Sequence, residues 1–277
     1  MKFFYCGKPK GIVGNRVSKS REDCEENILK QFELLERVTL PSLRDQSDPQ
    51  FRLVLLTSTR MPQECKDHLT WLLNHYLPGR SEVLFARPMV AGRVFRNYMQ
   101  RLGDGPDTVI QTQVLEGDAF GVTFVKTLRE HAIQSWSQIP TEKGQRTGGT
   151  FMSFKRGLKL RLRENTPVGL EVTSTSNAPF GLSLVARRTG RYNPELINPD
   201  VLGVKLPHVS IRTRDIHCMR VVSGESARNM PPVDEDILIQ ARQEFGVLKS
   251  ADAVARKRNR LRVAQTVDGV IGMRRAG

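Results

Sequence analysis

Apolar residues in the first half of the chain follow two alternating patterns, one helical and one extended. Between residues 24 and 43 they step by three and four positions, which predicts an amphipathic helix that Pro41 bounds near its end. The positions are Ile28, Phe32, Leu35 and Val38. Residues 51–57 (FRLVLLT) form a compact apolar run. Such a run is typical of a buried strand in a parallel sheet.

The alternation of helix and strand continues to about residue 135. Helices are predicted over 63–76 and 94–102, strands over 82–86 and 108–114, and a further helix is expected to begin near Val122. Repeated strand–helix units of this kind are the signature of βαβ units over a parallel sheet. We therefore predict an α/β arrangement for about residues 45–135.

The pattern changes after the turn at residues 147–149. Residues 151–163 alternate and are basic, and 170–175 and 182–187 are expected to be further strands, so the second half is predicted to be more antiparallel. One late helix is expected near 234–245. The tail, residues 249–277, is basic and thinly apolar, which predicts a helix with a frayed end.

Composition narrows the class of protein. The chain has 277 residues, 39% of them hydrophobic, which is too apolar for general disorder. No apolar run approaches the roughly 18 residues of a membrane span, and the N-terminus turns polar at residues 7–10, before a secretory segment could form. The four cysteines contain no C-x-x-C pair, which argues against structural zinc and a disulfide scaffold. We expect a cytoplasmic protein.

The charge balance points to anionic partners. Lys and Arg total 43 against 29 Asp and Glu, a net charge of +14. Nucleic acid, an acidic membrane surface and phosphorylated small molecules all fit such an excess. Net charge alone does not choose among them.

The first candidate for chemistry is an acidic pair after the predicted strand 108–114. Glu116 and Asp118 flank Gly117, and ligands of open α/β sheets bind outside the carboxyl ends of strands. Alternate residues of an extended segment share one face, so both carboxylates could hold Mg²⁺ or Mn²⁺, which would neutralise a diphosphate leaving group. The alternative is a polar turn in which Asp118 caps the helix near Val122.

Residues 31–48 (QFELLERVTLPSLRDQSD) resemble the opening block of the rhamnosyltransferase family. In that family a phenylalanine-containing helix runs into a Leu-Pro-Ser-Leu turn, and a Q-[ST]-D-x-x-F pattern leads into a strand. Residues 51–58, 61–62 and 181–185 continue the match, so the similarity covers roughly 30–215. The resemblance implies a GT-A-type glycosyltransferase: a mixed, largely parallel sheet flanked by helices, a nucleotide-sugar donor and a divalent metal, Mn²⁺ or Mg²⁺.

The resemblance also implies a set of site residues. Glu116 and Asp118 would hold the metal and act in catalysis, with His208 as a third metal ligand and His217 as its competitor. Four residues would bind the donor: Thr57, Arg93, Arg96 and Asn97. The alternatives are a solvated helix face for the arginines, a turn before a helix for Thr57 and a loop position for His208. Glu171 and Asp215 are both possible as a carboxylate base, and the sequence does not choose between them.

The acidic run departs from the family pattern. Where the family carries several aspartates, this chain has Leu115, Glu116, Gly117 and Asp118. This departure leaves a second hypothesis open: a non-catalytic protein of the same fold that binds nucleic acid or an anionic membrane through its basic charge. Residues 256–262 place five cations within seven positions, and they could contact phosphates, contact a membrane or be a solvated helix.

The sequence therefore predicts a glycosyltransferase that moves a sugar, rhamnose on the resemblance, from a nucleotide-diphosphate donor to a glycan, lipid-linked or other hydroxyl acceptor. We expect one domain over 1–248, with a nucleotide-sugar half at about 1–135 and an acceptor half at 136–248, followed by the basic tail 249–277. Peripheral contact with the inner membrane face fits that tail. Aromatic residues are sparse at 6%, so nucleic acid is the less favoured partner.

Overall fold

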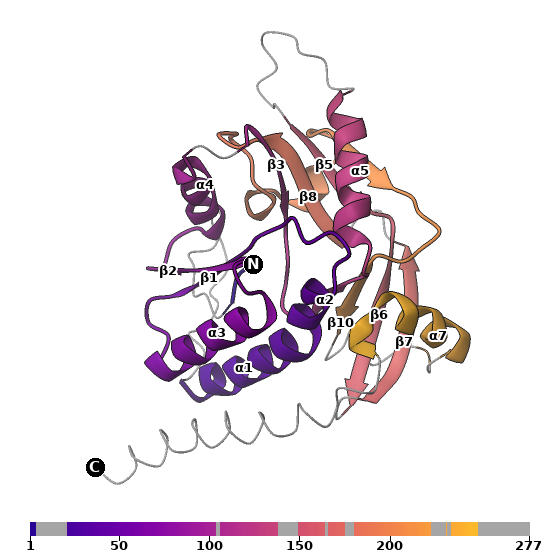
Figure 1. The fold of residues 1–277 in the computed structure, drawn as a ribbon, viewed down its shortest axis with the longest axis horizontal. Coiled ribbons are helices and arrows are strands. Elements are labelled where there is room, and N and C mark those ends of the chain that lie inside the picture. The colour runs from indigo at the N-terminus through magenta and orange to yellow at the C-terminus, as the bar shows by residue number, and fades with distance from the viewer. Residues whose placement is uncertain are drawn as a thin grey trace.

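The computed structural model describes residues 1–3, 21–103, 106–137, 149–163, 166–174, 180–222, 231 and 234–248. The predicted tail, with its basic cluster at 256–262, lies outside the described residues. Helices flank mixed β-sheets (Figure 1), so the predicted α/β class is confirmed. The division at residue 135 and the boundary at 248 stay predictions.

One long helical run opens the described chain. It consists of α1 (Arg21–Leu34), a π-helical turn η1 (Leu35–Thr39) and α2 (Leu40–Arg44), and it confirms the helix predicted over 24–43. Pro41 lies inside α2 and has no backbone N–H, so one hydrogen bond of the helix is missing at this position. The wider π turn directly before it is accommodated at this interruption.

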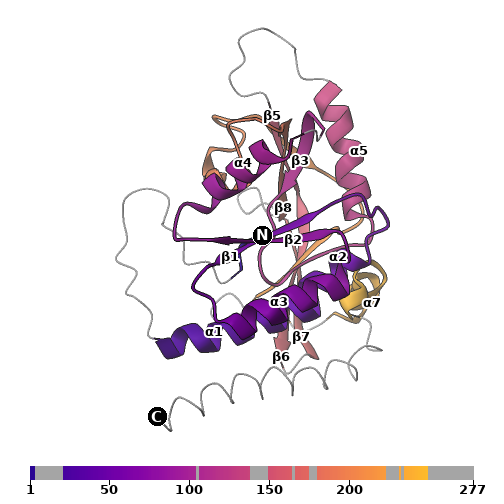
Figure 2. The same cartoon turned by 60° about the vertical axis from the view of Figure 1, so that its left-hand side comes forward.

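A small parallel sheet follows. Strands β1 (Leu53–Ser58) and β2 (Ser81–Ala86) pair in parallel, and Lys2 forms a parallel bridge with Leu56, so residues 1–3 lie along β1. Helix α3 (Gln63–Tyr76) connects the two strands, and α4 (Ala91–Arg101) follows β2. Both views show α3 and α1 side by side (Figure 2). The predicted helix 63–76 is confirmed to the residue.

Strand β3 (Thr108–Thr112) does not extend this parallel sheet, and that part of the prediction is wrong. It pairs antiparallel with β8 (Phe180–Arg187) over five residue pairs. The sheet has the order β3-β8-β5-β9, where β5 is Gly149–Phe154 and β9 is His208–Ile211. An apolar pattern predicts that a segment is extended, but the partner strand lies about 70 residues away and leaves no local signal.

A second four-stranded sheet has the order β4-β10-β6-β7. These strands are β4 (Asp118–Phe120), β10 (Cys218–Val221), β6 (Arg156–Arg163) and β7 (Thr166–Ser174). Strand β10 is antiparallel to β4 and parallel to β6, and β6 is antiparallel to β7. The short strands β4, β9 and β10 have no counterpart among the predicted elements.

Helices α5 (Phe124–Ser137) and α7 (Glu235–Glu244) complete the fold, together with the short turns η2 (Pro194–Leu196), η3 (Pro199–Val201) and η4 (Gly246–Leu248). The largest apolar cluster joins α1, α3 and α5 to the strands, and a second one packs α7 on β4, β10 and β6. Among the described residues, no helix is long and apolar enough to cross a membrane. Residues 113–121 run from β3 to α5 and include β4, so they connect the two larger sheets.

Candidate functional site

The predicted acidic pair lies in a tight turn between β3 and β4. Gly117 has φ +82°, a left-handed conformation that favours glycine. The Asp118 N–H donates to the Leu115 carbonyl at 3.1 Å, and the Leu115 N–H donates to Asp118 Oδ2 at 3.0 Å. Asp118 thus closes this turn and starts β4 rather than capping the following helix. We call residues 115–118 the acidic turn.

The Asp118 carboxylate is paired with Arg220. The two residues are directly opposite each other in the β4–β10 register. Arg220 Nε lies 2.6 Å from Asp118 Oδ1 and Nη2 lies 3.3 Å from Oδ2. Asp118 is 6% exposed. Burial raises the pKa of Asp118, and the Arg220 hydrogen bond opposes that shift. Burial would lower the pKa of Arg220, but Asp118 raises it above its ordinary value, so Arg220 stays cationic.

Glu116 faces a different set of groups. Burial raises the pKa of Glu116, while its own backbone N–H and the charge of Lys2 lower it. Lys2 Nζ pairs with Glu195 Oε2 at 3.0 Å, and Gln113 Nε2 donates to Glu195 Oε1 at 3.0 Å. Glu195, whose side chain is 8% exposed, therefore connects η2 to the residues after β3. Sequence reasoning missed Glu195 and Arg220, because both reach the site through strand and turn contacts without a local motif.

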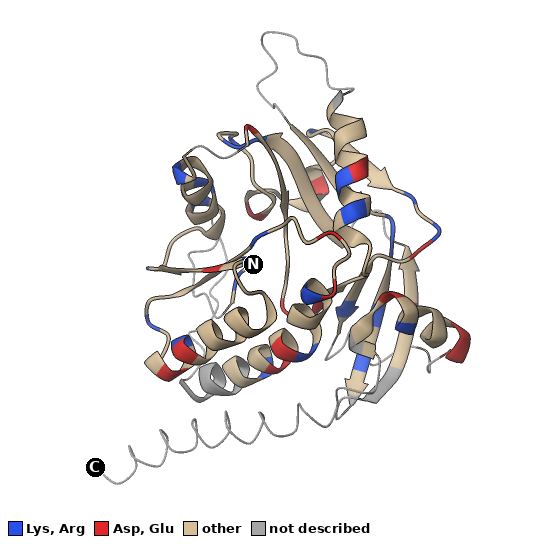
Figure 3. Ribbon diagram, viewed as in Figure 1, with Lys and Arg blue, Asp and Glu red and all other residues tan. Residues whose placement is uncertain are grey.

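Helix α4 carries three of the four predicted donor-binding residues. Arg93 and Asn97 are exposed, and Arg96 is half-buried. The Arg96 Nε is buried and has no hydrogen-bond partner among the described residues. A Cβ on Gly92 would meet the Leu196 side chain, so α4 packs closely on η2. Figure 3 shows basic residues along α4 and on β10. Helix α4 thus packs on η2, whose Glu195 accepts a hydrogen bond from Gln113, two residues before the acidic turn.

The fourth predicted donor-binding residue, Thr57, lies in the core. Its side chain is fully buried, and its hydroxyl lies 3.7 Å from Met61 Sδ. The neighbouring Ser58 Oγ accepts the Arg60 N–H at 3.1 Å. Both side chains therefore serve the turn between β1 and α3. The structure does not bring Thr57 to the surface on which Arg93 and Asn97 lie.

The three predicted metal ligands do not come together. His208 is on β9, in the other four-stranded sheet, and its Nε2 lies 2.8 Å from Ser153 Oγ. Within the described ranges, no three His, Cys, Asp or Glu side chains are placed to hold one metal ion. Asp118 is already bonded to Arg220. Among the described residues, the predicted ligands therefore do not form the three-ligand site for a divalent metal that the resemblance implies.

The remaining candidates have local partners. His217 is buried, and its Nδ1 lies 3.2 Å from Thr123 Oγ1. Burial lowers the pKa of His217, and the charge of Asp215 opposes this shift. Glu171 lies on β7 and its carboxylate is 3.5 Å from Lys159 Nζ. Neither Glu171 nor the exposed Asp215 has a hydrogen bond or ion pair to the acidic turn within the described residues.

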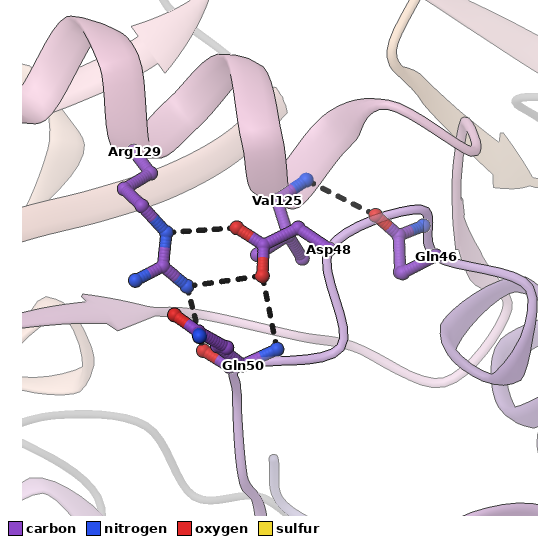
Figure 4. Close-up of polar contacts among 5 residues, drawn as sticks. All are labelled: Gln46, Asp48, Gln50, Val125 and Arg129. Atoms are coloured by element: carbon purple, nitrogen blue, oxygen red, sulfur yellow. Dashed lines mark hydrogen bonds and ion pairs between the residues drawn. The ribbon is translucent and has the colours of Figure 1, made fainter.

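The Q-S-D-P-Q-F segment (residues 46–51) has a structural role. Gln46 Nε2 donates to the carbonyls of Ser42 at 2.9 Å and Gly121 at 2.8 Å, and its Oε1 accepts the Val125 N–H at 3.0 Å. Asp48 forms a two-pronged ion pair with Arg129 of α5, with separations of 2.8 and 3.2 Å (Figure 4). We call these contacts of Gln46 and Asp48 the glutamine–aspartate clamp. The clamp holds Gly121 and the first turns of α5, directly after β4, the strand that begins at Asp118.

The sequence of this region matches a known family. A family model described as "Putative rhamnosyl transferase" matches residues 23–229, more than half of the chain. The chain belongs to this family. Membership makes it a glycosyltransferase, which acts on a sugar donor and an acceptor. No curated protein matches the chain.

The region matched by the family model contains the main features of the candidate site. The glutamine–aspartate clamp, the acidic turn, α4, Glu195 and Arg220 all lie within residues 23–229 of this glycosyltransferase. The tail 249–277 lies beyond the matched region. The family assignment therefore rests on the segment that builds the candidate site, and the basic tail contributes no part of it.

Proposed function

We propose that this glycosyltransferase moves a hexose, rhamnose in the light of its family, from a nucleotide-diphosphate donor to a hydroxyl group of a glycan. The family match over residues 23–229 carries the proposal. The glycan is free or lipid-linked. Cytoplasmic placement and peripheral contact with a membrane stay predictions.

In this proposal the donor's diphosphate binds along α4. Arg96 has a buried Nε without a partner among the described residues, and the exposed Arg93 lies one turn earlier. Residues three apart share a helix face, and a guanidinium binds phosphate oxygens through two parallel hydrogen bonds. Negative charge grows on the leaving diphosphate as the sugar–oxygen bond breaks. Fixed cations stabilise that charge in the transition state.

Glu116 is the carboxylate that we propose as the base. The Asp118 carboxylate is already bonded to Arg220. Glu116 is partly exposed, and burial raises its pKa. A carboxylate of raised pKa is a better proton acceptor near neutral pH. The acceptor hydroxyl gives its proton to Glu116, its oxygen bonds to the sugar's anomeric carbon, and the bond from that carbon to the diphosphate oxygen breaks. The nucleoside diphosphate leaves with the electron pair.

A donor screen tests this function. The full chain is incubated with uridine-, thymidine- and guanosine-diphosphate sugars and an oligosaccharide acceptor mixture, and released nucleoside diphosphate is measured. We expect release from one donor class that depends on the acceptor. Release from none of the donors would overturn the proposed activity.

Two matched variants test the base. Glu116→Gln is expected to lower kcat by about 100-fold, the lower range for loss of a general base. Glu171→Gln changes another partly exposed glutamate, on β7, and is expected to leave kcat within about twofold. Equal activity of the two variants would refute the role of Glu116 without touching the donor assignment.

A further inference from the structure

One of the two carboxylates that the resemblance assigns to a metal, that of Asp118, has both oxygens bonded to other groups of the protein. Asp118 Oδ1 accepts from Arg220 Nε at 2.6 Å, and Oδ2 accepts from Arg220 Nη2 at 3.3 Å and from the Leu115 N–H at 3.0 Å. The side chain is 8% exposed. A metal ion would have to displace the half-buried Arg220 guanidinium to reach either oxygen, and breaking an ion pair whose carboxylate is buried is unfavourable.

The other positions of the acidic turn do not compensate. Leu115 and Gly117 have no side-chain oxygen. Glu116 is close enough to Lys2 for that ammonium to lower its pKa. In the part of the chain that the structure describes, no third carboxylate, imidazole or thiol completes a metal-binding group. Hard divalent cations take oxygen ligands, and Mg²⁺ is commonly held by one or two carboxylates together with waters and substrate phosphates.

Arg220 has hydrogen-bonding capacity left over. A guanidinium has five N–H donors, and Asp118 takes one from Nε and one from Nη2. Among the described residues no other acceptor bonds to Arg220. Its side chain is 32% exposed, and its guanidinium carbon lies 5.7 Å from the centre of the Phe180 ring. The cation is held in place by Asp118 and Phe180, and three of its N–H groups have no partner among the described residues.

We propose that the Arg220 guanidinium is the resident cation of the acidic turn, and that this turn binds a phosphate group of the nucleoside diphosphate without a divalent metal. This inference rests on the proposed function for the identity of the ligand. The Asp118–Arg220 pair is neutral overall, so a divalent cation gains little by binding there. An anionic phosphate can still accept hydrogen bonds from the outer edge of the guanidinium.

The first experiment measures metal alone. Mn²⁺ binding to the full chain is followed by electron paramagnetic resonance, for the wild type and for Asp118→Asn. We expect no Mn²⁺ site tighter than about 1 mM that depends on Asp118, because well-built protein sites for divalent cations bind more tightly. A site tighter than about 1 mM that Asp118→Asn removes would overturn the proposal. This readout needs no donor and no turnover.

The second experiment measures nucleotide binding by calorimetry, with uridine diphosphate and thymidine diphosphate, in Mn²⁺ or in EDTA. We expect Kd values within about twofold of each other in the two conditions. Arg220→Gln is expected to weaken binding by about tenfold or more, the effect of losing one charged hydrogen-bonding partner. Arg156→Gln, an exposed arginine of β6 in the same sheet, is the matched control and should bind as the wild type does.

Thermal unfolding of each variant separates loss of binding from loss of fold. Arg220→Lys keeps the charge on β10 and serves if Arg220→Gln does not fold; we expect it to bind more weakly because a lysine has no planar fork. Binding that requires Mn²⁺, or that is unchanged in a folded Arg220 variant, would overturn the proposal. Failure of every nucleotide to bind would overturn the proposed donor class as well, whereas the Mn²⁺ measurement would still decide the metal question.

Discussion

Replacement of Gln46 by alanine should destabilise the protein more than any exposed change in the same segment. Gln46 is 7% exposed, and its amide contacts α2, α5 and the last residue of β4 together with the Gly121 that follows it. Its Nε2 donates to the carbonyls of Ser42 and Gly121, and its Oε1 accepts the Val125 N–H near the start of α5. Alanine removes all three contacts and leaves a cavity in which those backbone groups have lost their partner.

The magnitude follows from these contacts. An intramolecular hydrogen bond contributes a net 0.5–1.5 kcal/mol, roughly, and a buried group left without a partner costs about 1–3 kcal/mol. We therefore expect Gln46→Ala to lower the free energy of unfolding by about 3 kcal/mol. A domain of ordinary stability has about 5–15 kcal/mol in total, so the variant should stay folded at 25 °C. The corresponding fall in Tm is on the order of 10 °C.

Guanidinium unfolding followed by circular dichroism measures this loss. Gln50→Ala is the control, because Gln50 is exposed and takes part in the segment only through its backbone. A second variant, Gln46→Glu, keeps an acceptor for the Val125 N–H but turns a carboxylate oxygen toward two carbonyls. It should be at least as destabilised at pH 7. A loss below about 1 kcal/mol for Gln46→Ala, or one no larger than that of Gln50→Ala, would refute the reasoning.

Three further outcomes can be checked by the same unfolding method. Arg129→Lys replaces the fork that binds both oxygens of Asp48 and should lose about 1 kcal/mol; an unchanged midpoint would show that the pair contributes little. Gly117→Ala should lose about 1–2 kcal/mol because φ is +82°, and a more stable variant would contradict this. Burial lowers the pKa of His217. Just below pH 6.5 the unfolded chain therefore binds a proton at this residue and the folded chain does not. The stability present above pH 6.5 is lost as pH falls through the lower, folded-state pKa. His217→Asn should flatten the fall in stability below about pH 6.5, by at most about 1.4 kcal/mol per pH unit; identical slopes for variant and wild type would contradict it.

Much of the first half of the fold could be predicted because its signals are local. Helix α3 was predicted to the residue, since four apolar positions recur at helical spacing between Pro62 and the turn at residues 77–80. Strands β1 and β2 were predicted within two residues of their observed ends. In each case the segment carries its own period and its own breaking residues, so no distant contact was needed to predict it.

The pairing of strands could not be predicted, and part of the site depends on it. Strands β4 and β10 have three and four residues, too few to show an alternating pattern. Their antiparallel register places Arg220 opposite Asp118, 102 residues apart in the chain. The sequence therefore indicated Asp118 as chemically active and gave no sign of its partner. For His208 the prediction failed in the other direction. Its imidazole is a common metal ligand, but the strand that carries it belongs to the sheet that does not contain β4 and Asp118.

The Gln46–Asp48 segment and the acidic turn have different roles in the structure. Gln46 and Asp48 form a clamp of buried hydrogen bonds and an ion pair, and changing either disturbs the backbone that leads into α5. Buried groups with several hydrogen-bond partners are costly to replace, so residues of this kind carry information about the fold. The acidic turn is held in shape by backbone contacts, by Gly117 and by the Asp118–Arg220 pair, so side chains such as Leu115 can change without altering the turn. A chain can therefore keep this fold while its acidic turn changes, as the proposed replacement of a metal ion by Arg220 requires. The presence of Gln46 and Asp48 predicts the fold but says nothing about the metal.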